Sequence, residues 1–323
     1  MIAFGPVPSR RLGRSLGINN VPPKVCTYSC VYCQLGRTLR LQTERQVFRE
    51  PAAVVTAVRE KLEAAGRAGE RVDYLTFVPD GEPTLDANLG RTIGLLRPLG
   101  IPIAVISNGS LVDRADVRAE LSEADWLSLK IDAVREETWR SVCRPHGGLR
   151  LGPILDGMRE LVAGFRGQLA TETMVLADLN DAESELRATA EFVGELRPGT
   201  AYLSVPTRPP AEPWAQPATE SAIARAYEVF RAWQGRVELL VGYEGDAFAS
   251  TGDPGEDLLS ITAVHPMREA AVRKLVERAG SGWQLVTDLV SQGKLVEVEY
   301  GAHRYYMRPI GPRGRRTEDP CRS

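Results

Sequence analysis

The stretch RSLGINNVPPKVCTYSCVYC, residues 14–33, joins a run typical of a β-strand to a loop that holds three of the chain's five cysteines. Cys26, Cys30 and Cys33 are spaced four and three residues apart, with no other cysteine or histidine beside them. A disulfide uses two thiols and a closed zinc site takes four ligands, so neither fits a set of three. The spacing is a strong signal of a metal site.

Three soft thiolates on a short, proline-flanked loop suit an iron–sulfur cluster, because each iron takes a sulfur ligand from the protein. Three ligands for a four-iron cube leave one iron open, and an open metal position is where a substrate or cofactor binds. Two alternatives remain: a zinc site completed by a distant histidine such as His146, and cysteines that are merely buried. A disulfide framework is disfavoured, since five cysteines are few for 323 residues.

Outside this loop, short β-like runs alternate with longer amphipathic segments. The β-like runs are 14–20, 72–78, 101–107, 125–132, 169–176 and 201–206. The helical segments are 51–66, 86–98, 113–122, 150–165, 181–196 and 218–234. Alternation of this kind predicts parallel strands joined by crossover helices. Six such units fit a partial or full β/α barrel, with its chemistry at the carboxyl ends of the strands, although a doubly wound sheet gives a similar periodicity.

The last part of the chain predicts a second, smaller unit after the barrel, which is expected to span residues 1–243. A proline-rich surface loop, 207–217, lies within the barrel region, and a linker, 244–257, follows it. Two helical stretches and two strands around a Gly-Ala turn come next, which is the order of a winged-helix-like domain, 258–310. The tail, 311–323, has the composition of a disordered segment.

Composition limits the partners and the compartment. The formal net charge is −2, which excludes nucleic-acid binding driven by bulk positive charge but permits a local basic patch. No apolar run approaches a membrane span, and the first residues have no apolar core of signal-peptide length. We therefore expect a protein retained in the reducing cytoplasm, without membrane contact.

The segment CTYSCVYC, at the end of the first predicted strand, resembles the signature of the radical S-adenosylmethionine superfamily. The resemblance implies that Cys26, Cys30 and Cys33 hold a 4Fe-4S cluster whose open iron is chelated by the amine and carboxylate of S-adenosylmethionine. An electron would then cleave this cofactor to a 5′-deoxyadenosyl radical. Tyr32 matches the aromatic residue usual before the last cysteine. We expect an α/β protein built as a partial (β/α)6 TIM-like barrel with the winged-helix-like domain at its carboxyl end.

The same resemblance implies cofactor-binding residues at the ends of the next strands. Gly81 and Glu82 match the Gly-Gly-Glu-like element that holds the methionyl ammonium, with Asp80 in place of its first glycine. By itself this segment is also a solvated helix start, since acidic residues favour that end of a helix. Asn108 closes the third predicted strand, where it would hydrogen-bond the cofactor's ribose or make an ordinary turn.

Lys130 and Asp132 share one face of the run WLSLKID, while its two inner leucines and the isoleucine share the other. The apolar face would pack against helices, so the polar face is expected to point into the barrel. Buried lysine and aspartate need partners, so the two would pair or hold a polar ligand. Similar enzymes bind the cofactor there, which makes Lys130 a candidate for its carboxylate and Asp132 for its ribose.

Two further features stand near the predicted site. Cys143, expected in a loop after the fourth strand, is a candidate catalytic residue as a radical-quenching hydrogen donor or a substrate contact. A lone cysteine is more often a small buried hydrophobe. Arg10, Arg11 and Arg14 lie close to the first strand, where they would bind a phosphate-bearing substrate or form a solvated cluster.

The longer run FGPVPSRRLGRSLGINNVPPKVCTYSCVYCQLGRT, residues 4–38, resembles a subgroup of small iron–sulfur oxidoreductases grouped with the tRNA wyosine-synthesis radical enzymes. Those enzymes hold a second cluster with further cysteines. This chain has only Cys143 and Cys321 left, so pyruvate-dependent wyosine chemistry does not carry over.

The substrate stays open between tRNA or another RNA, a peptide and a small metabolite. The electron is expected from a flavodoxin or ferredoxin, because no flavin or second-cluster motif is visible. The rival function is a non-catalytic metal- or iron–sulfur-binding adaptor for RNA or protein.

Overall fold

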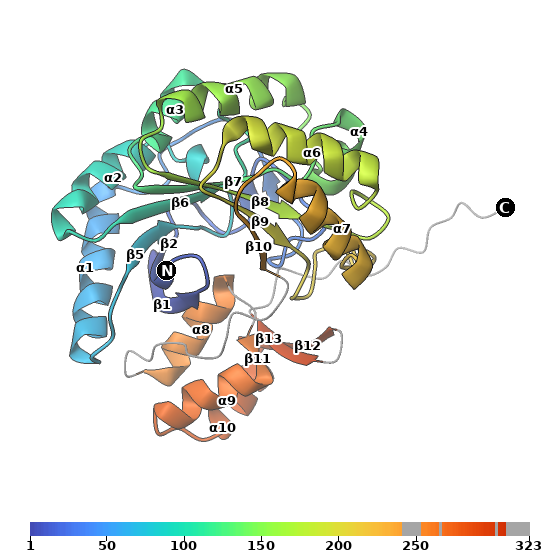
Figure 1. Ribbon diagram of the computed structural model, residues 1–323. Coiled ribbons are helices and arrows are strands. Elements are labelled where there is room, and N and C mark those ends of the chain that lie inside the picture. Colours follow the sequence, from blue (N-terminus) through green and yellow to red (C-terminus); the bar gives the residue numbers. More distant parts are fainter. Residues whose placement is uncertain (241–252, 265–266, 301–302, 308–323) are drawn as a thin grey trace.

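The computed structural model describes residues 1–240, 253–264, 267–300 and 303–307. Within these residues an eight-stranded sheet has the order β1-β2-β5-β6-β7-β8-β9-β10 (Figure 1). Its strands are β1 (Ala3–Ser9), β2 (Gly13–Ile18), β5 (Tyr74–Phe77), β6 (Ile103–Ser107), β7 (Trp126–Lys130), β8 (Gln168–Met174), β9 (Thr200–Ser204) and β10 (Val237–Leu240). Neighbours from β2 to β10 are parallel, and β1 pairs antiparallel with β2. The mostly parallel α/β sheet expected from the alternation is confirmed.

Helices follow the strands and cover the outer face of the sheet (Figure 1). They are α1 (Pro51–Arg67), α2 (Leu89–Leu96), α3 (Ala115–Leu121), α4 (Glu136–Cys143), α5 (Leu151–Gly164), α6 (Glu183–Leu196) and α7 (Glu220–Arg231), with the short 3-10 helices η1 (Pro83–Leu85) and η2 (Arg97–Leu99) on either side of α2. Each expected strand and helix of the barrel has its counterpart, and β1, α4 and β10 are additional. The sheet order begins at β1 and ends at β10, so the sheet is open, as it is in a partial barrel. No helix within the described residues is both long and apolar enough to cross a bilayer.

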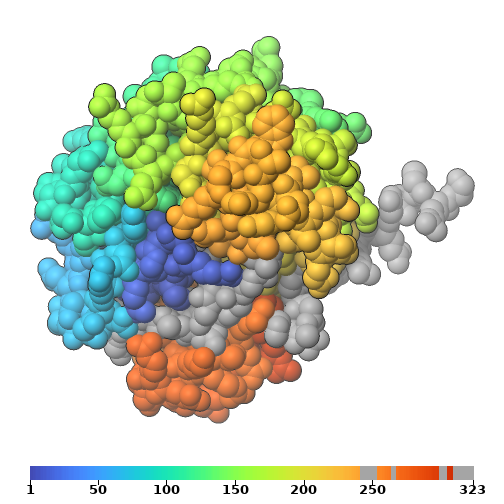
Figure 2. Space-filling model, in the orientation of Figure 1, coloured from blue at the N-terminus to red at the C-terminus, as the bar shows by residue number. Residues whose placement is uncertain are grey.

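Alternate residues of each strand face opposite sides of the sheet, as the pleat requires. In β7, Leu127 and Leu129 are fully buried in the core beneath the helices. Trp126 instead joins Leu12 and Tyr202 in a separate apolar cluster. Leu12 comes from the turn between β1 and β2, and Trp126 begins its strand, so the N-terminal hairpin covers the amino end of the barrel. Figure 2 shows these first residues in blue at the surface, between the light-blue first helix and the orange surface of α7.

Residues from 253 onward contribute a second group of elements with an apolar core of its own. The elements are α8 (Pro254–Val264), β11 (Met267–Arg268), α9 (Glu269–Arg278), α10 (Gln284–Ser291), β12 (Val296–Tyr300) and β13 (His303–Met307). Both expected helices are present, and β12 and β13 pair antiparallel. Of the expected linker, residues 244–252 lie outside the described residues and 254–257 begin α8. The expected tail, 311–323, also lies outside them. That this group is a winged-helix-like domain stays a prediction.

This C-terminal group lies beside β1 (Figure 1). Val7 of β1 packs against its apolar core. The Tyr305 hydroxyl donates a hydrogen bond to Thr207 O at 2.5 Å, at the start of the proline-rich loop. Arg278 of α9 pairs with Glu70 at 3.0 Å, just after α1. The group therefore contacts the barrel through one edge strand and two loops.

Candidate functional site

The carboxyl ends of the parallel strands meet at one edge of the sheet, and the cysteine loop, residues 26–33, follows the first of them. The chain leaves β2 and reaches Cys26 in the short strand β3 (Val25–Cys26). This strand pairs in parallel with β4 (Arg40–Leu41), so the segment that holds Cys30 and Cys33 is a loop with both ends tied together. In β/α barrels this edge is where catalytic residues gather.

The end of α4 fixes the cysteine loop from one side. Ser29 N donates to Cys143 O at 3.0 Å, and His146 N donates to Thr27 O at 2.9 Å. Such bonds satisfy backbone groups that an irregular loop would otherwise leave unpaired. The path of the chain past the cysteines is therefore set by the segment that follows β7.

The three loop cysteines are free thiols, each partly exposed. Lys24 lies beside them, and its ammonium donates to Gly36 O just beyond the loop. Burial raises the pKa of Cys33, and the positive charge of Lys24 opposes this rise. A cation next to thiols favours the thiolate form that metals bind.

A four-iron cluster and a single ion make different demands on these thiols. Within the described part of the chain, no three His, Cys, Asp or Glu side chains are gathered closely enough to hold one ion. A four-iron cube takes one thiolate per iron, so its cysteine ligands surround a volume and need not converge on one point. The histidine weighed for a zinc site, His146, has its Nδ1 engaged as the acceptor of Gly148 N at 3.1 Å.

Gly81 lies directly against β3. A methyl group at this position would stand 1.9 Å from Val25 O, so any side chain here would displace β3 or the loop after β5. The neighbouring amide, Glu82 N, donates to the same oxygen at 3.2 Å, and Lys24 N donates to Asp80 O at 2.7 Å. The element after β5 therefore contacts the cysteine-bearing strand through its backbone, with glycine required at its centre.

The carboxylate of Glu82 is only 1% exposed and accepts four hydrogen bonds from the chain itself. Oε1 accepts from Ser107 Oγ and Thr84 Oγ1, each at 2.7 Å, and from Thr84 N at 3.1 Å. Oε2 accepts from Asn108 N at 2.8 Å. Burial raises the pKa of Glu82, and these donors oppose the rise. Glu82 thus holds together the loops after β5 and β6, and its contact with the cofactor stays a prediction.

Asn108 joins the loop after β6 to the cysteine loop. Its Nδ2 donates to Thr27 Oγ1 at 2.8 Å and lies 3.7 Å from Cys26 Sγ. Its Oδ1 accepts from Ser110 N at 2.9 Å. A donor beside a thiolate ligand is the kind of contact that orients and tunes a metal site. The sequence predicted a ribose contact for Asn108 but not this contact with Cys26.

Lys130 and Asp132 both reach the site, but their nearest partners are other residues. Lys130 Nζ lies 3.1 Å from Glu172 Oε1 and 4.8 Å from the centroid of the Tyr32 ring. Asp132 accepts hydrogen bonds from the Tyr32 hydroxyl and, at 2.8 Å, from Met174 N. The pairing of Lys130 with Asp132 that the sequence suggested gives way to a pair with Glu172, because β8 places Glu172 directly opposite Lys130.

Glu172 balances the charges of the barrel interior. Its carboxylate pairs with Lys130 and Arg11 and accepts from Ser204 Oγ at 3.1 Å. Burial alone would raise the pKa of Glu172, but Lys130 and Arg11 lower it to about 2. Burial likewise opposes the charge of Lys130, yet the carboxylate of Glu172 holds the pKa of Lys130 above its usual range. Glu172 lies on the inward face of β8, on the same side as Lys130.

The N-terminal arginines are engaged by the fold itself. Their partners are Leu239 O for Arg10, Glu172 for Arg11 and Glu70 for Arg14. Because these partners belong to three different segments, the structure does not assemble the three arginines into one phosphate site.

Cys143 is the last residue of α4, so the loop expected around it is wrong. The side chain is 3% exposed and lies 3.7 Å from Asp132 Oδ2. A hydrogen bond with Cys30 and burial together raise the pKa of the Cys143 thiol. α4 has only eight residues, and its buried face consists of Trp139, Val142 and Cys143. The residue therefore stands beside the cysteine loop, beneath the surface of the site.

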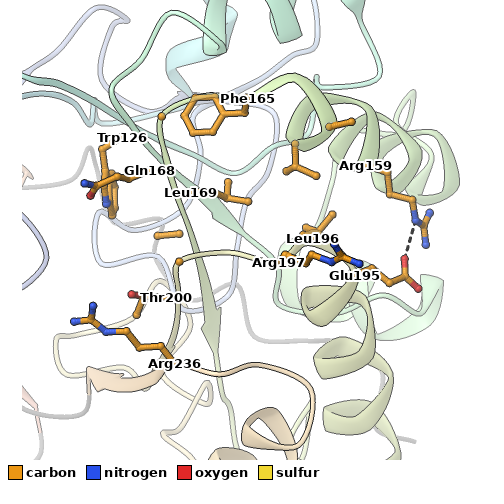
Figure 3. A pocket seen from close by; sticks show the side chains of 15 residues that line it. Trp126, Arg159, Phe165, Gln168, Leu169, Glu195, Leu196, Arg197, Thr200 and Arg236 are labelled. Carbon is orange, nitrogen blue, oxygen red and sulfur yellow. Dashed lines mark hydrogen bonds and ion pairs between the residues drawn. The ribbon is translucent and has the colours of Figure 1, made fainter.

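A cavity of about 750 Å³ lies at the opposite end of the barrel, where the strands begin (Figure 3). Its lining includes Trp126, Gln168 and Thr200, the first residues of β7, β8 and β9. Arg159 and Glu195, also in the lining, form an ion pair at 2.8 Å (Figure 3). None of the four cysteines in the described part of the chain lines this cavity, so it is separate from the candidate site.

Known proteins place the chain in a family. Residues 20–193 match the radical SAM superfamily. Over 321 residues the chain is 42% identical to UPF0026 protein MJ1312 of Methanocaldococcus jannaschii, with 99% of each chain covered. The chain belongs to the radical SAM superfamily.

Two solved structures share the fold. A radical SAM methyltransferase from Sphaerobacter thermophilus matches with a TM-score of 0.53 and 18% identity, over 70% of this chain and 66% of that one. TYW1 with a lysine–pyruvate adduct matches with a TM-score of 0.52 and 16% identity, over 68% of this chain and 73% of that one. At these identities the likeness concerns the fold alone.

Proposed function

We propose that this chain reductively cleaves S-adenosylmethionine at a 4Fe-4S cluster held by Cys26, Cys30 and Cys33, and that the resulting 5′-deoxyadenosyl radical abstracts hydrogen from a substrate. Membership of the radical SAM superfamily supports the chemistry. The observation that carries the assignment to these residues is the set of three free thiols on a tied loop where β2 ends. The bound cluster would supply the electron that splits the cofactor.

The proposed cofactor-binding residues surround that loop. They are Tyr32, Gly81, Glu82, Asn108, Lys130 and Asp132. Gly81 permits close approach of two backbones, and Glu82 keeps Asn108 beside the loop. The carboxylate of Asp132 already accepts from the Tyr32 hydroxyl and from Met174 N. Each oxygen can accept a further hydrogen bond, which a ribose hydroxyl would donate.

Lys130 suits the carboxylate of the cofactor. An ammonium has three N–H donors, and Glu172 engages one of them, so others remain for a second anionic group. Burial would lower the pKa of Lys130, but the carboxylate of Glu172 raises it above its usual range. The side chain is therefore charged at neutral pH. A permanently protonated amine is a poor nucleophile, so the lysine–pyruvate adduct of TYW1 is not proposed for Lys130.

The substrate class is proposed from the resemblance: a tRNA or other RNA, or a peptide. Cys143 stays a candidate hydrogen donor or substrate contact, because its thiol stands next to Asp132 within the site. The winged-helix-like group beside β1 is the proposed substrate or partner contact, and a flavodoxin or ferredoxin the proposed electron donor. Function in the reducing cytoplasm follows from the need to keep such a cluster intact.

Anaerobic reconstitution tests the proposed function. The chain is expected to bind about four irons and four sulfides, and to release 5′-deoxyadenosine and methionine when dithionite and S-adenosylmethionine are added. A brown protein that releases no 5′-deoxyadenosine under these conditions would instead support the non-catalytic adaptor. A colourless protein with one zinc would contradict the radical function and would fit the adaptor as a zinc-binding protein.

A further inference from the structure

The cysteine loop is covered on three sides by the rest of the chain. Val31 N donates to Val142 O at 3.0 Å, beside α4. Glu212 N, from the proline-rich loop, donates to Val31 O at 2.9 Å. Tyr32 turns inward to Asp132 within the barrel. The strand β4, whose two residues are exposed, pairs with β3 along a further side of the loop.

β4 forms a thin outer wall. In its pairing with β3, Leu41 stands opposite Cys26, and Gln42 N donates to Cys26 O at 3.1 Å. Paired strands lie about 4.8 Å apart, so a molecule seated on β4 is one strand's width from a cluster cysteine.

Two exposed leucines lie at β4, Leu41 within the strand and Leu39 directly before it. Leu39 is 70% exposed and Leu41 38% exposed. Trp214, on the neighbouring proline-rich loop, is 52% exposed. Edge strands normally carry charges or prolines that discourage pairing, and exposed apolar side chains gathered in one place mark contact surfaces.

Arginines accompany these apolar side chains, with Arg40 between the two leucines in the sequence. Arg37 and Arg144 both pair with the single carboxylate of Glu212, which leaves one positive charge in excess, and Arg144 lies 5.6 Å from the Trp214 ring centroid. Among the described residues, no carboxylate lies within ion-pair distance of Arg40. Residues 34–42 contain two arginines and no acidic residue, and the next acid along the chain is Glu44.

We propose that this surface, called here the β4 face, docks an acidic flavodoxin that delivers the electron to the cluster. The β4 face consists of Arg37, Leu39, Arg40, Leu41, Arg144 and Trp214. The proposal rests on the proposed function, since it names the donor for that site. The arginines complement an acidic rim, and the leucines suit the apolar edge that a flavin exposes. An RNA backbone would pair with the arginines but would leave Leu39 and Leu41 without a partner.

The redox step at this face is a transfer of one electron. The reduced flavin loses one electron, the cluster held by the three cysteines gains it, and no bond of this chain forms or breaks. A cluster held by these cysteines would pass the electron on to the sulfonium of S-adenosylmethionine, and the C5′–S bond would break to give methionine and the 5′-deoxyadenosyl radical.

The test compares a protein donor with a small one that needs no docking surface. The variant Leu39→Ser/Arg40→Glu is matched by Arg91→Glu/Leu95→Ser, which changes an exposed arginine and an exposed leucine on α2. Affinity for oxidised flavodoxin is measured on the reconstituted protein at low and high ionic strength. Release of 5′-deoxyadenosine is measured with reduced flavodoxin and, separately, with dithionite.

We expect the β4-face variant to bind flavodoxin about tenfold more weakly or worse and to lose flavodoxin-driven release to a similar degree, with dithionite-driven release unchanged. The α2 variant should match the wild type, and wild-type binding should weaken at high ionic strength. Three results would overturn the proposal. The β4-face variant could bind flavodoxin as tightly as the wild type does, or the wild type could bind only a ferredoxin. The variant could also lose 5′-deoxyadenosine release equally with flavodoxin and with dithionite. If the wild type releases no 5′-deoxyadenosine even with dithionite, the proposed function itself fails. The flavodoxin affinities of the wild type and the variant would still test the β4 face as a docking surface.

Discussion

Lys130 and Glu172 face each other across the neighbouring strands β7 and β8, with 3.1 Å between Nζ and Oε1. The other carboxylate oxygen accepts from Arg11, which lies in the turn between β1 and β2. One carboxylate therefore pairs with two largely buried cations and ties the N-terminal hairpin to the middle of the sheet. The same contact holds Lys130 under the ring of Tyr32, at the inner side of the cysteine loop.

Replacing Glu172 with glutamine is expected to destabilise the fold. It leaves two cations without their counter-charge, and removing one partner of a buried ion pair costs about 3 kcal/mol or more. The control is Glu183→Gln, which breaks an exposed pair with Arg187 on α6 and should cost about 0.5 kcal/mol or less. Urea unfolding of both variants measures the difference, and equal costs would show that Glu172 does not carry this charge balance.

The pair also predicts a dependence of stability on pH. Lys130 and Arg11 depress the pKa of Glu172 from an ordinary 4.5 to about 2. A depressed carboxyl pKa contributes stability above the unfolded value, and this contribution is lost as the pH falls through the folded value. Between about pH 5 and pH 2 the free energy of unfolding of the cluster-free wild type should therefore fall by about 3 kcal/mol through this carboxyl. The variant Glu172→Gln has no carboxyl here and should not show this part of the loss. Parallel stability curves for the two proteins over this range would contradict the assignment.

Gly81→Ala is expected to disturb the cysteine loop. The added methyl would meet Val25 O at 1.9 Å, so β3 must shift, at a cost of about 1–3 kcal/mol, and Cys26 shifts with it. Gly94→Ala on α2 is the matched control, because no atom lies within 4 Å of its added methyl and alanine favours the helix by about 0.5–1 kcal/mol. We expect lower iron content and a lower Tm for the first variant only. Full iron content and an unchanged Tm in Gly81→Ala would refute the close contact.

Cys143→Ala should keep the cluster. Cys143 is buried beneath the loop, on the side of Asp132, and the three loop thiols are the proposed ligands of the irons. Loss of the sulfur from a packed site should cost about 1 kcal/mol of stability. Iron content and cofactor cleavage should equal those of the wild type, while any loss of turnover on a substrate would locate the residue in the radical step. Loss of iron as complete as in Cys30→Ala would make Cys143 a ligand.

The barrel elements could be predicted because their apolar residues repeat with the period of the structure they form. β7 is an example, since the outward Leu127 and Leu129 alternate with the inward Ser128 and Lys130. β1 was missed because its stretch AFGPVPS contains two prolines, which argue against a strand. The structure uses this segment at the edge of the sheet, where its register shifts between Phe4 and Val7.

The site could be predicted only as far as single segments determine it. The spacing of the cysteines and the polar face of WLSLKID are local, and both lead to residues at the same edge of the sheet. The partners of Lys130 and Asn108 are not local: Glu172 is brought there by strand register and Thr27 by the course of the cysteine loop. α4 was missed because eight residues show barely two turns of periodicity.

The most direct test of the account replaces Cys26, Cys30 and Cys33 by alanine one at a time, with Cys321→Ala as the control thiol. Each reconstituted protein is assayed for iron and for 5′-deoxyadenosine released with dithionite. We predict that each loop variant loses the intact cluster and all cofactor cleavage, while Cys321→Ala keeps both. Wild-type iron content and wild-type release in any one of the three loop variants would contradict the central claim.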